Sequence, residues 1–253
     1  MKKQLIAFLI AIGSTIAGAA QDNPAAVVSA MQQLVTTYSR SPQLSFSIEY
    51  RYAALDKPGL FLDSMKGQVK ISRGRCWYSL AETECILNND YQILLFKEDQ
   101  LIYLSKPSKE IAHSMALQGM APQALDMLDS LLRTGKDIQS SFTEDGTRRV
   151  IKLVFNQHPV YKELSWHISK KSGYIERMVS VMKSGQLYDP SVRSQVNDQD
   201  SYAIVETLYS NYSSGGVEES VFTTDRYITR EGTEYHPAAA YNNYKIFFGS
   251  QGL

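Results

Sequence analysis

The hydrophobic and polar positions of this chain alternate in short runs, most densely between residues 66 and 105. Turn-forming residues separate these runs, with about ten residues for each strand and its turn. This spacing predicts an antiparallel meander, which is a scaffold and carries no chemistry of its own. The predicted strands are rich in β-branched, aromatic and aliphatic side chains and comprise Val69–Ser72, Cys76–Leu80, Thr83–Leu87, Tyr91–Phe96 and Leu101–Leu104.

A long strand is predicted just before this meander, where the alternation is cleanest. Serine, glutamate and arginine occupy every second position there, so one face of the strand is predicted to be exposed to solvent. The apolar positions between them point the other way and are Leu44, Phe46, Ile48, Tyr50 and Tyr52. Such a stripe must be buried against another element of the fold.

Two helices are predicted by apolar residues at helical spacing. The first covers Ala25–Ser39, with Asn23 as its N-cap and Pro24 as its first residue. The second interrupts the strands about halfway along the chain and is closed by Gly135. Its apolar stripe comprises Ala124, Leu125, Leu128, Leu131 and Leu132.

Strand-like segments resume after this second helix and continue to the end of the chain. We therefore predict a mainly β protein with helices (α+β), containing about eleven strands and two or three helices. Nothing in the pattern requires a boundary between two domains, so residues 20–253 are predicted to form a single domain.

The first nineteen residues are predicted to be a signal peptide. Lys2 and Lys3 form a basic start, Leu5–Ile16 an apolar core, and Ala17–Ala19 a cleavage site of small residues. We therefore expect a periplasmic or secreted protein with no transmembrane segment in the mature chain. The 26 basic and 26 acidic residues balance, which argues against nucleic acid as a partner.

The two cysteines, Cys76 and Cys85, lie on neighbouring predicted strands around Ala81. If the hairpin places them opposite each other, a disulfide is within reach, and an exported location permits one. The alternative is a pair of reduced cysteines that act as small hydrophobic residues.

Catalytic and metal-binding patterns are missing from the sequence. The four histidines, His113, His158, His167 and His236, stand far apart and belong to no ligand motif. No nucleophile motif, phosphate loop or dinucleotide fingerprint occurs either. We expect a protein without enzymatic activity, cofactor or metal.

The remaining feature that could serve a function is the large amount of apolar surface on the predicted strands and helices. A curved antiparallel sheet has a concave face, and apolar helices can cover it without filling it. The hypothesis is a cavity for an acyl chain, in which the strand stripe and the helix stripe face each other; the alternative is a packed core. The predicted ligand-binding residues are Leu44, Phe46, Ile48, Tyr50, Leu125, Leu128 and Leu132.

The order of elements resembles the family of periplasmic carriers that includes LolA, LolB and RseB. The most specific segment is GQVKISRGRCWYSL, and LNNDYQILLFKEDQLIYL resembles the hairpin that follows it in the family, without its glycine. On this alignment Arg73 takes the place of an arginine that helps to hold the lid helix closed. The family's next residue is proline, whereas this chain has Gly74.

The resemblance implies an unclosed β-barrel whose apolar concave side, lidded by helices, binds acyl chains without catalysis. We therefore expect an exported, non-enzymatic binder of lipid or lipoprotein acyl groups, with a carrier or sorting role in the cell envelope. The alternative, from a different class, is a regulatory or structural module with a filled core that recognises an envelope protein partner.

Overall fold

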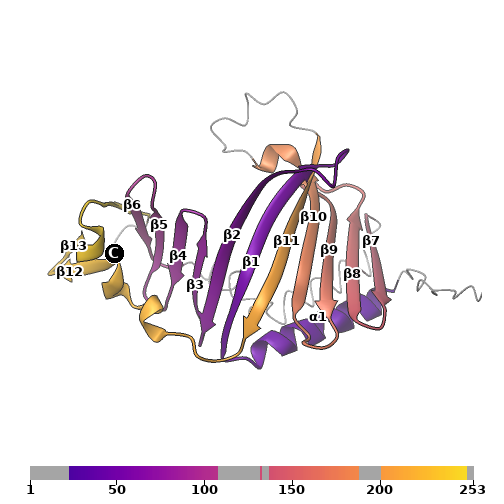
Figure 1. Ribbon diagram of the computed structural model, residues 1–253, viewed down its shortest axis with the longest axis horizontal. Helices are drawn as coiled ribbons and strands as arrows, with labels where there is room; N and C mark the ends of the chain where they lie inside the picture. The colour runs from indigo at the N-terminus through magenta and orange to yellow at the C-terminus, as the bar shows by residue number, and fades with distance from the viewer. Residues whose placement is uncertain (1–22, 108–131, 133–136, 188–200, 250–253) are drawn as a thin grey trace, which may run out of the picture.

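The computed structural model describes residues 23–107, 132, 137–187 and 201–249. The strands of its main sheet are β1 (Gln43–Ala54), β2 (Phe61–Ser72), β3 (Arg75–Leu80), β4 (Thr83–Leu87), β5 (Gln92–Phe96), β6 (Leu101–Ser105), β7 (Ile138–Glu144), β8 (Arg148–Phe155), β9 (Tyr161–Ser169), β10 (Ile175–Lys183), β11 (Tyr202–Ser213) and β14 (Lys245–Phe248). Their order across the sheet is β14-β6-β5-β4-β3-β2-β1-β11-β10-β9-β8-β7 (Figure 1). Strands β12 (Ile228–Glu231) and β13 (Glu234–Pro237) form a separate hairpin.

The sheet is open, with β14 at one edge and β7 at the other. All its neighbours pair antiparallel except β14, which pairs parallel to β6. The predicted meander is confirmed as β2 to β6, and the mainly β class is confirmed too. The predicted count of eleven strands is wrong, because the sheet has twelve and β12 and β13 add two more. The four-residue strands near the C-terminus are too short to show a clear alternation.

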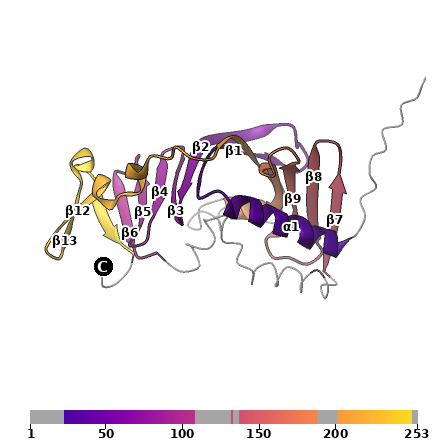
Figure 2. The same ribbon diagram turned by 90° about the horizontal axis from the view of Figure 1, so that it is seen from below.

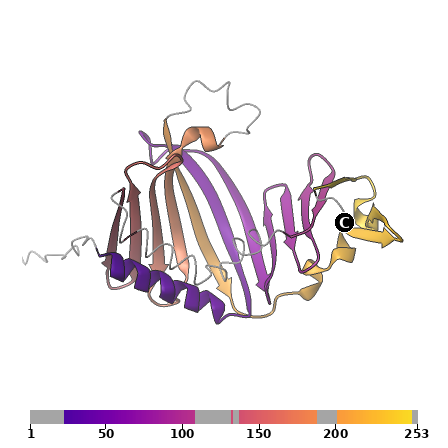
Figure 3. The same cartoon turned by 180° about the vertical axis from the view of Figure 1, so that it is seen from behind.

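Helix α1 (Pro24–Ser39) lies where the sequence predicts it. The Asn23 side chain accepts a hydrogen bond of 3.0 Å from the Ala26 amide. Pro24 has no amide hydrogen, which suits the first turn of a helix, where amide hydrogens have no acceptor within the helix. The helix crosses the ends of β7 to β11 on one face of the sheet, and β1 and β2 arch over it (Figures 2 and 3). This face is the concave one. The second predicted helix lies outside the described residues except for Leu132, which is helical.

The first hydrophobic core lies between α1 and the concave face. Val27, Met31 and Tyr38 of α1 are at most 1% exposed and pack with Leu44 and Phe46 of β1. The other buried members on the sheet come from β2, β3, β4 and β8 to β10 and include Ile71, Cys76, Leu87, Ile151, Leu153, Ile168 and Ile175. The stripe of β1 is thus buried at Leu44 and Phe46, whereas Ile48, Tyr50 and Tyr52 are only partly buried.

A second core lies on the opposite face of β3 to β6. Side chains alternate along a strand, so Trp77 points away from the face that Cys76 joins. Trp77 packs with Ile86, Ile93 and Ile102, and the segment after β11 covers them with Phe222 and Tyr227. That segment contains η3 (Glu219–Phe222), η4 (Thr224–Arg226) and η5 (Ala239–Tyr241), which are 3₁₀ turns without a strand or helix period. The two halves of the sheet therefore bury opposite faces.

The outer face of β1, β11 and β10 is polar, and one buried carboxylate on it connects the three strands. Glu206 is 3% exposed and forms ion pairs with Arg51 on one neighbouring strand and Arg177 on the other. Burial by itself would raise the pKa of Glu206, but the hydrogen bonds from Arg51 and Arg177 outweigh burial and lower it. This carboxylate therefore stabilises the pairing of three strands at neutral pH.

Replacing Glu206 with Gln is expected to lower the free energy of unfolding at pH 7 by about 1–3 kcal/mol. The ion pair with Arg177 contributes less to this loss, because Arg177 is half-exposed and solvent screens its charge. Because the folded-state pKa is lowered, the contribution is complete above the unfolded value of about 4.3 and is lost as pH falls through the folded value. Urea unfolding of wild type and variant should therefore converge in acid. Glu176→Gln, at an exposed pair with Arg148, is the control and should change little. An equal loss for both variants, or a gap that persists in acid, would contradict this role.

The cysteines do not face each other as predicted. Cys76 pairs with Leu87 and Cys85 with Tyr78, so the two thiols are diagonal neighbours. Diagonal positions have Cα atoms about 7–8 Å apart, beyond the usual span of a disulfide. Both cysteines are buried and free. The direct opposition that motivated the disulfide is therefore wrong.

Both thiols are expected to resist labelling in the folded protein. Burial raises the pKa of Cys76 and of Cys85 to about 12, and the neighbouring Cys85 adds to the effect at Cys76. At pH 8 about one thiol in ten thousand is then ionised, and the thiolate is the reactive form. Iodoacetamide should modify two thiols per chain in denaturant without reductant and almost none in native buffer. A single modified thiol, or none, in denaturant would contradict the two free cysteines.

Candidate functional site: the apolar concave face

Residues that the structure describes line two cavities on the concave face. The larger, of ≈ 560 Å³, lies between the end of β1, the start of β2 and the start of β11. The smaller, of ≈ 190 Å³, lies over the middle of β1, β2 and β3. The larger volume falls within the range of small-molecule sites, about 300–1,000 Å³.

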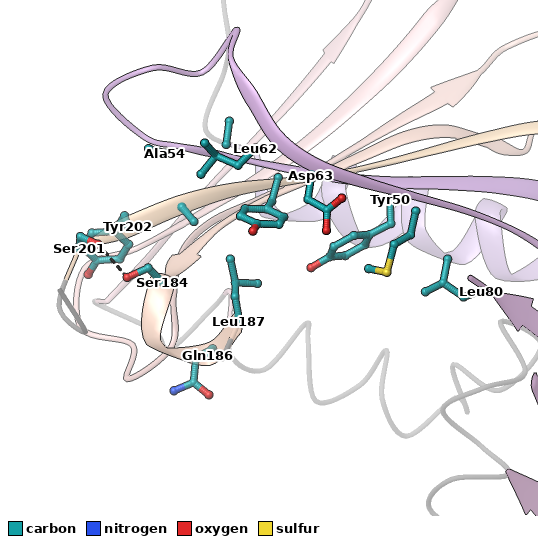
Figure 4. Close-up of a pocket in the computed structure, with 14 residues that line it drawn as sticks. Tyr50, Ala54, Leu62, Asp63, Leu80, Ser184, Gln186, Leu187, Ser201 and Tyr202 are labelled. Atoms are coloured by element: carbon teal, nitrogen blue, oxygen red, sulfur yellow. Dashed lines mark hydrogen bonds between the residues drawn. The ribbon is translucent and has the colours of Figure 1, made fainter. Parts of the chain in front are cut away.

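The wall of the larger cavity is mostly apolar (Figure 4). Tyr50 and Tyr52 of β1 and Met65 of β2 line it on the sheet. The turn η2 (Ser184–Leu187) closes one side with Leu187. The lining is completed by Ala53, Ala54, Leu62, Asp63, Leu80, Ser184, Gln186, Ser201, Tyr202 and Ala203.

The cavity exists because small side chains meet at the end of the sheet. Ala54 pairs with Ala203 of β11, and the β1–β2 register shifts between Tyr52 and Ala53. A register shift bends the strand, and alanines leave space that longer side chains would fill. Leu62, at the rim, is 62% exposed, so the cavity has an apolar mouth open to solvent.

Polar groups stand at the edge of this cavity. Asp63 brings an exposed carboxylate to the wall, and the hydroxyls of Ser184 and Ser201 are 2.7 Å apart (Figure 4). Burial, followed by the nearby Tyr52 and Tyr161, raises the pKa of Tyr50, so its hydroxyl stays protonated at neutral pH. The site can hold an apolar chain and offer hydrogen bonds at its mouth.

The smaller cavity is lined by Phe46 and Ile48 of β1, Val69 of β2, and Tyr78 and Tyr209 on neighbouring strands. Burial raises the pKa of Tyr78 to about 12 and that of Tyr209 to about 12. Both phenols are therefore neutral at any physiological pH. The cavity is an uncharged apolar space.

The two cavities are neighbours on one face. Ile48 lines the smaller and Tyr50 the larger, and they are successive residues on that side of β1, about 7 Å apart. Gly67 lies between Met65 and Val69 on β2 and leaves a gap in the row of side chains. A Cβ there would come within 2.1 Å of the Ser79 carbonyl oxygen, so the close approach of β2 to β3 requires glycine.

The predicted ligand-binding residues do not all reach a cavity. Leu44 is 1% exposed inside the core under α1, and Leu132 is buried in the same cluster. Phe46 and Ile48 line the smaller cavity and Tyr50 the larger. Leu125 and Leu128 lie outside the described residues. Their role as ligand contacts stays a prediction.

Arg73 lies in the turn between β2 and β3, with an exposed side chain. Its amide donates a hydrogen bond of 3.0 Å to the Pro42 carbonyl, just after α1. The lid helix that it is predicted to hold falls on residues outside the described ones, so this contact also stays a prediction.

The sequence analysis did not identify the cavity residues at this end of the sheet, which include Ala53, Ala54, Leu62, Ser184, Leu187 and Ala203. Periodicity shows which side chains share a face, but it does not show which end of a stripe is left open. The signal that the sequence offered was the pair Ala53-Ala54 at the end of a strand of large side chains. The described residues contain no group of three His, Cys, Asp or Glu placed to hold a metal ion. None of the helices in the described part of the chain is long and apolar enough to span a membrane.

No protein-family model and no curated protein matches the chain. Solved structures do match. A LolA superfamily protein from Nitrosomonas europaea matches with a TM-score of 0.35 and 10% identity, over 77% of this chain and 98% of its own. The chain resembles LolA superfamily proteins.

Two further solved structures match the chain at a similar level. The lipoprotein LppX of Mycobacterium tuberculosis matches with a TM-score of 0.37 and 11% identity, over 76% of this chain and 97% of its own. A chain of the MucA/MucB complex of Pseudomonas aeruginosa matches with a TM-score of 0.37 and 8% identity, over 79% of this chain and 61% of its own. TM-scores below 0.5 leave wide differences in backbone path, so what these proteins bind is not transferred to this chain.

Proposed function

We propose that this protein is an exported, non-enzymatic binder of the acyl group of a lipid or lipoprotein, with a carrier or sorting role in the cell envelope. The observation that carries the proposal is the open apolar cavity of ≈ 560 Å³ at the end of β1, β2 and β11. Its wall offers apolar contacts, while Asp63 and the serine hydroxyls stand at its edge. Such a wall suits an apolar chain that carries a polar end.

The energetics favour a long chain. Each buried methylene contributes about 0.8 kcal/mol, whereas association costs about 4–15 kcal/mol in lost freedom. A ligand therefore needs about ten buried methylenes to bind firmly. We infer that the ligand occupies both neighbouring cavities, along the track from Ala54 past Tyr50 to Phe46.

An apolar fluorescent dye tests this function. N-phenyl-1-naphthylamine should bind the purified protein saturably, with its fluorescence enhanced, and palmitate should displace it. Hexanoate should displace it at least tenfold less well, because fewer methylenes are buried. Absence of saturable dye binding, or equal displacement by both fatty acids, would refute an acyl-chain site.

A second candidate function is recognition of an envelope protein partner, and the exposed aromatic edge of β14 favours it. Phe247 is 53% exposed and Phe248 is 55% exposed on the last strand of the sheet. Large apolar side chains at a sheet edge are common in protein interfaces. In this function the cavities would bind no acyl chain, so the dye titration separates the two candidates.

A further inference from the structure

A third hollow, of ≈ 560 Å³, opens at the opposite end of the sheet from the larger apolar cavity. The end of α1, the start of β1, the β2–β3 turn and the end of β11 meet there, at the lower edge of the sheet in Figure 1. Its lining is polar and includes Arg40, Arg73, Gln43, Tyr174 and Ser214. We call it the arginine pocket.

Two arginines from separate elements line this pocket. Arg40 follows the last residue of α1, and Arg73 belongs to the β2–β3 turn. Within the described part of the chain, neither side chain takes part in an ion pair or a hydrogen bond, and none of the lining residues is acidic. Two like charges beside one pocket repel each other, and a bound anion would relieve this repulsion.

The backbone of the turn adds an independent observation. Arg73 has φ 49° and Gly74 has φ 80°, so both residues of the two-residue turn are left-handed. Asn-Gly is the favoured pair in such turns, and a long side chain at the first position is uncommon. Ala81 and Gln100 have a similar φ in the turns that follow, so this φ is a feature of the turns of the sheet and fixes where the Arg73 side chain leaves the backbone. The hydrogen bond from the Arg73 amide to Pro42 fixes the turn against the segment that follows Arg40.

Glu219 is a carboxylate that contacts the lining residue Gln43, and it already has several partners. Glu219 accepts hydrogen bonds from Ser72 at 2.8 Å and Gln43 at 3.1 Å, and it pairs with Arg75. The hydrogen bond from Ser72, and then that from Arg75, lower the pKa of Glu219, and the charge of Arg73 contributes less. In the described part of the chain, Glu219 thus pairs with Arg75 and forms no ion pair with Arg40 or Arg73.

We propose that the arginine pocket binds a phosphate group. A guanidinium group can donate two parallel hydrogen bonds to two phosphate oxygens. Two guanidinium groups that approach from different directions can therefore bind an anion with more than two oxygens. The Ser214 hydroxyl is a further donor at the wall, and the Gln43 amide has a second N–H besides the one that it donates to Glu219. The phosphate comes from free inorganic phosphate or from a phospholipid headgroup. The arginine pocket shares no lining residue with the two apolar cavities. Phosphate binding can therefore be present or absent whether or not the protein binds an acyl chain.

Titration of the full chain with inorganic phosphate, in a buffer free of phosphate and sulfate, tests the proposal by calorimetry. Arg73→Asn and Arg40→Gln should each weaken binding at least tenfold. Asparagine suits a left-handed turn position, so Arg73→Asn should melt at or above the wild-type temperature and separates loss of binding from loss of folding. Lys57→Gln, an exposed change at the opposite end of β1, is the matched control and should bind as wild type does.

Vesicle flotation distinguishes the two sources of phosphate. If a headgroup is the ligand, phosphatidylcholine vesicles that contain phosphatidic acid should bind wild type and Lys57→Gln but not Arg73→Asn. If free phosphate is the ligand, calorimetry alone should show the arginine dependence. The proposal is overturned if neither probe binds, if both arginine variants bind as wild type does, or if Lys57→Gln weakens binding equally.

Discussion

Ala54→Phe is expected to weaken binding of the apolar dye at least tenfold while leaving the melting temperature almost unchanged. Ala54 is half-buried at the end of β1 and lines the larger cavity. A phenyl ring there would occupy space that the folded protein leaves open, so it competes with a ligand without straining its neighbours. In a filled core the same enlargement would cost about 1–3 kcal/mol.

Ser64→Phe is the matched control for this change. Ser64 is an exposed residue of β2 that pairs with Arg51 of β1, on the polar face of the same hairpin. The same ring added there should leave dye binding unchanged. A lower melting temperature for Ala54→Phe with unchanged dye binding would identify the site as packed core.

Tyr38→Ala is expected to lower the free energy of unfolding by about 3–5 kcal/mol, the usual cost of removing a buried aromatic side chain. Tyr38 is 1% exposed at the end of α1, and its ring lies edge-on to Tyr174, with centroids 5.2 Å apart. Its hydroxyl is 2.9 Å from that of Tyr212, which stacks on Tyr174 at 4.5 Å and donates to the Ile175 carbonyl at 2.8 Å. The cluster fastens the end of α1 to β10 and β11.

Tyr38→Phe distinguishes the contribution of the ring to stability from that of the hydroxyl. It keeps the packing and removes the hydrogen bonds of the hydroxyl with Tyr212 and with the Ile175 amide, so we expect a loss of about 1–2 kcal/mol. Urea unfolding at 25 °C, followed by tryptophan fluorescence and circular dichroism, measures both variants. If Tyr38→Ala were no more destabilised than Tyr38→Phe, α1 would not be held through this cluster.

The elements that the sequence predicted well are those whose signal is local. Helix α1 has its cap, its proline and its apolar face within sixteen residues, and the stripe of β1 depends only on alternation. The meander was predicted for the same reason. By contrast, a hairpin register depends on the centre of its turn. Moving that centre by one residue moves the partner of Cys76 by two, from Cys85 to Leu87.

The parts that could not be predicted depend on distant pairing. The larger cavity forms where Ala54 meets Ala203, and nothing near either residue indicates that β1 and β11 are neighbours. The second core depends on Phe222 and Tyr227, which cover β3 to β6 from 3₁₀ turns that have no period of their own. The arginine pocket likewise joins Arg40 and Arg73, which pattern reasoning treats as separate surface residues.

Lipid extraction tests the central claim most directly. The full chain would be expressed with its N-terminal segment, purified without detergent and extracted with organic solvent for mass spectrometry, beside Ala54→Phe and Ser64→Phe. We expect near-stoichiometric acyl lipid on the wild type and on Ser64→Phe, and a loss of at least tenfold on Ala54→Phe. Wild-type protein that carries no acyl lipid and binds none when incubated with vesicles would contradict it.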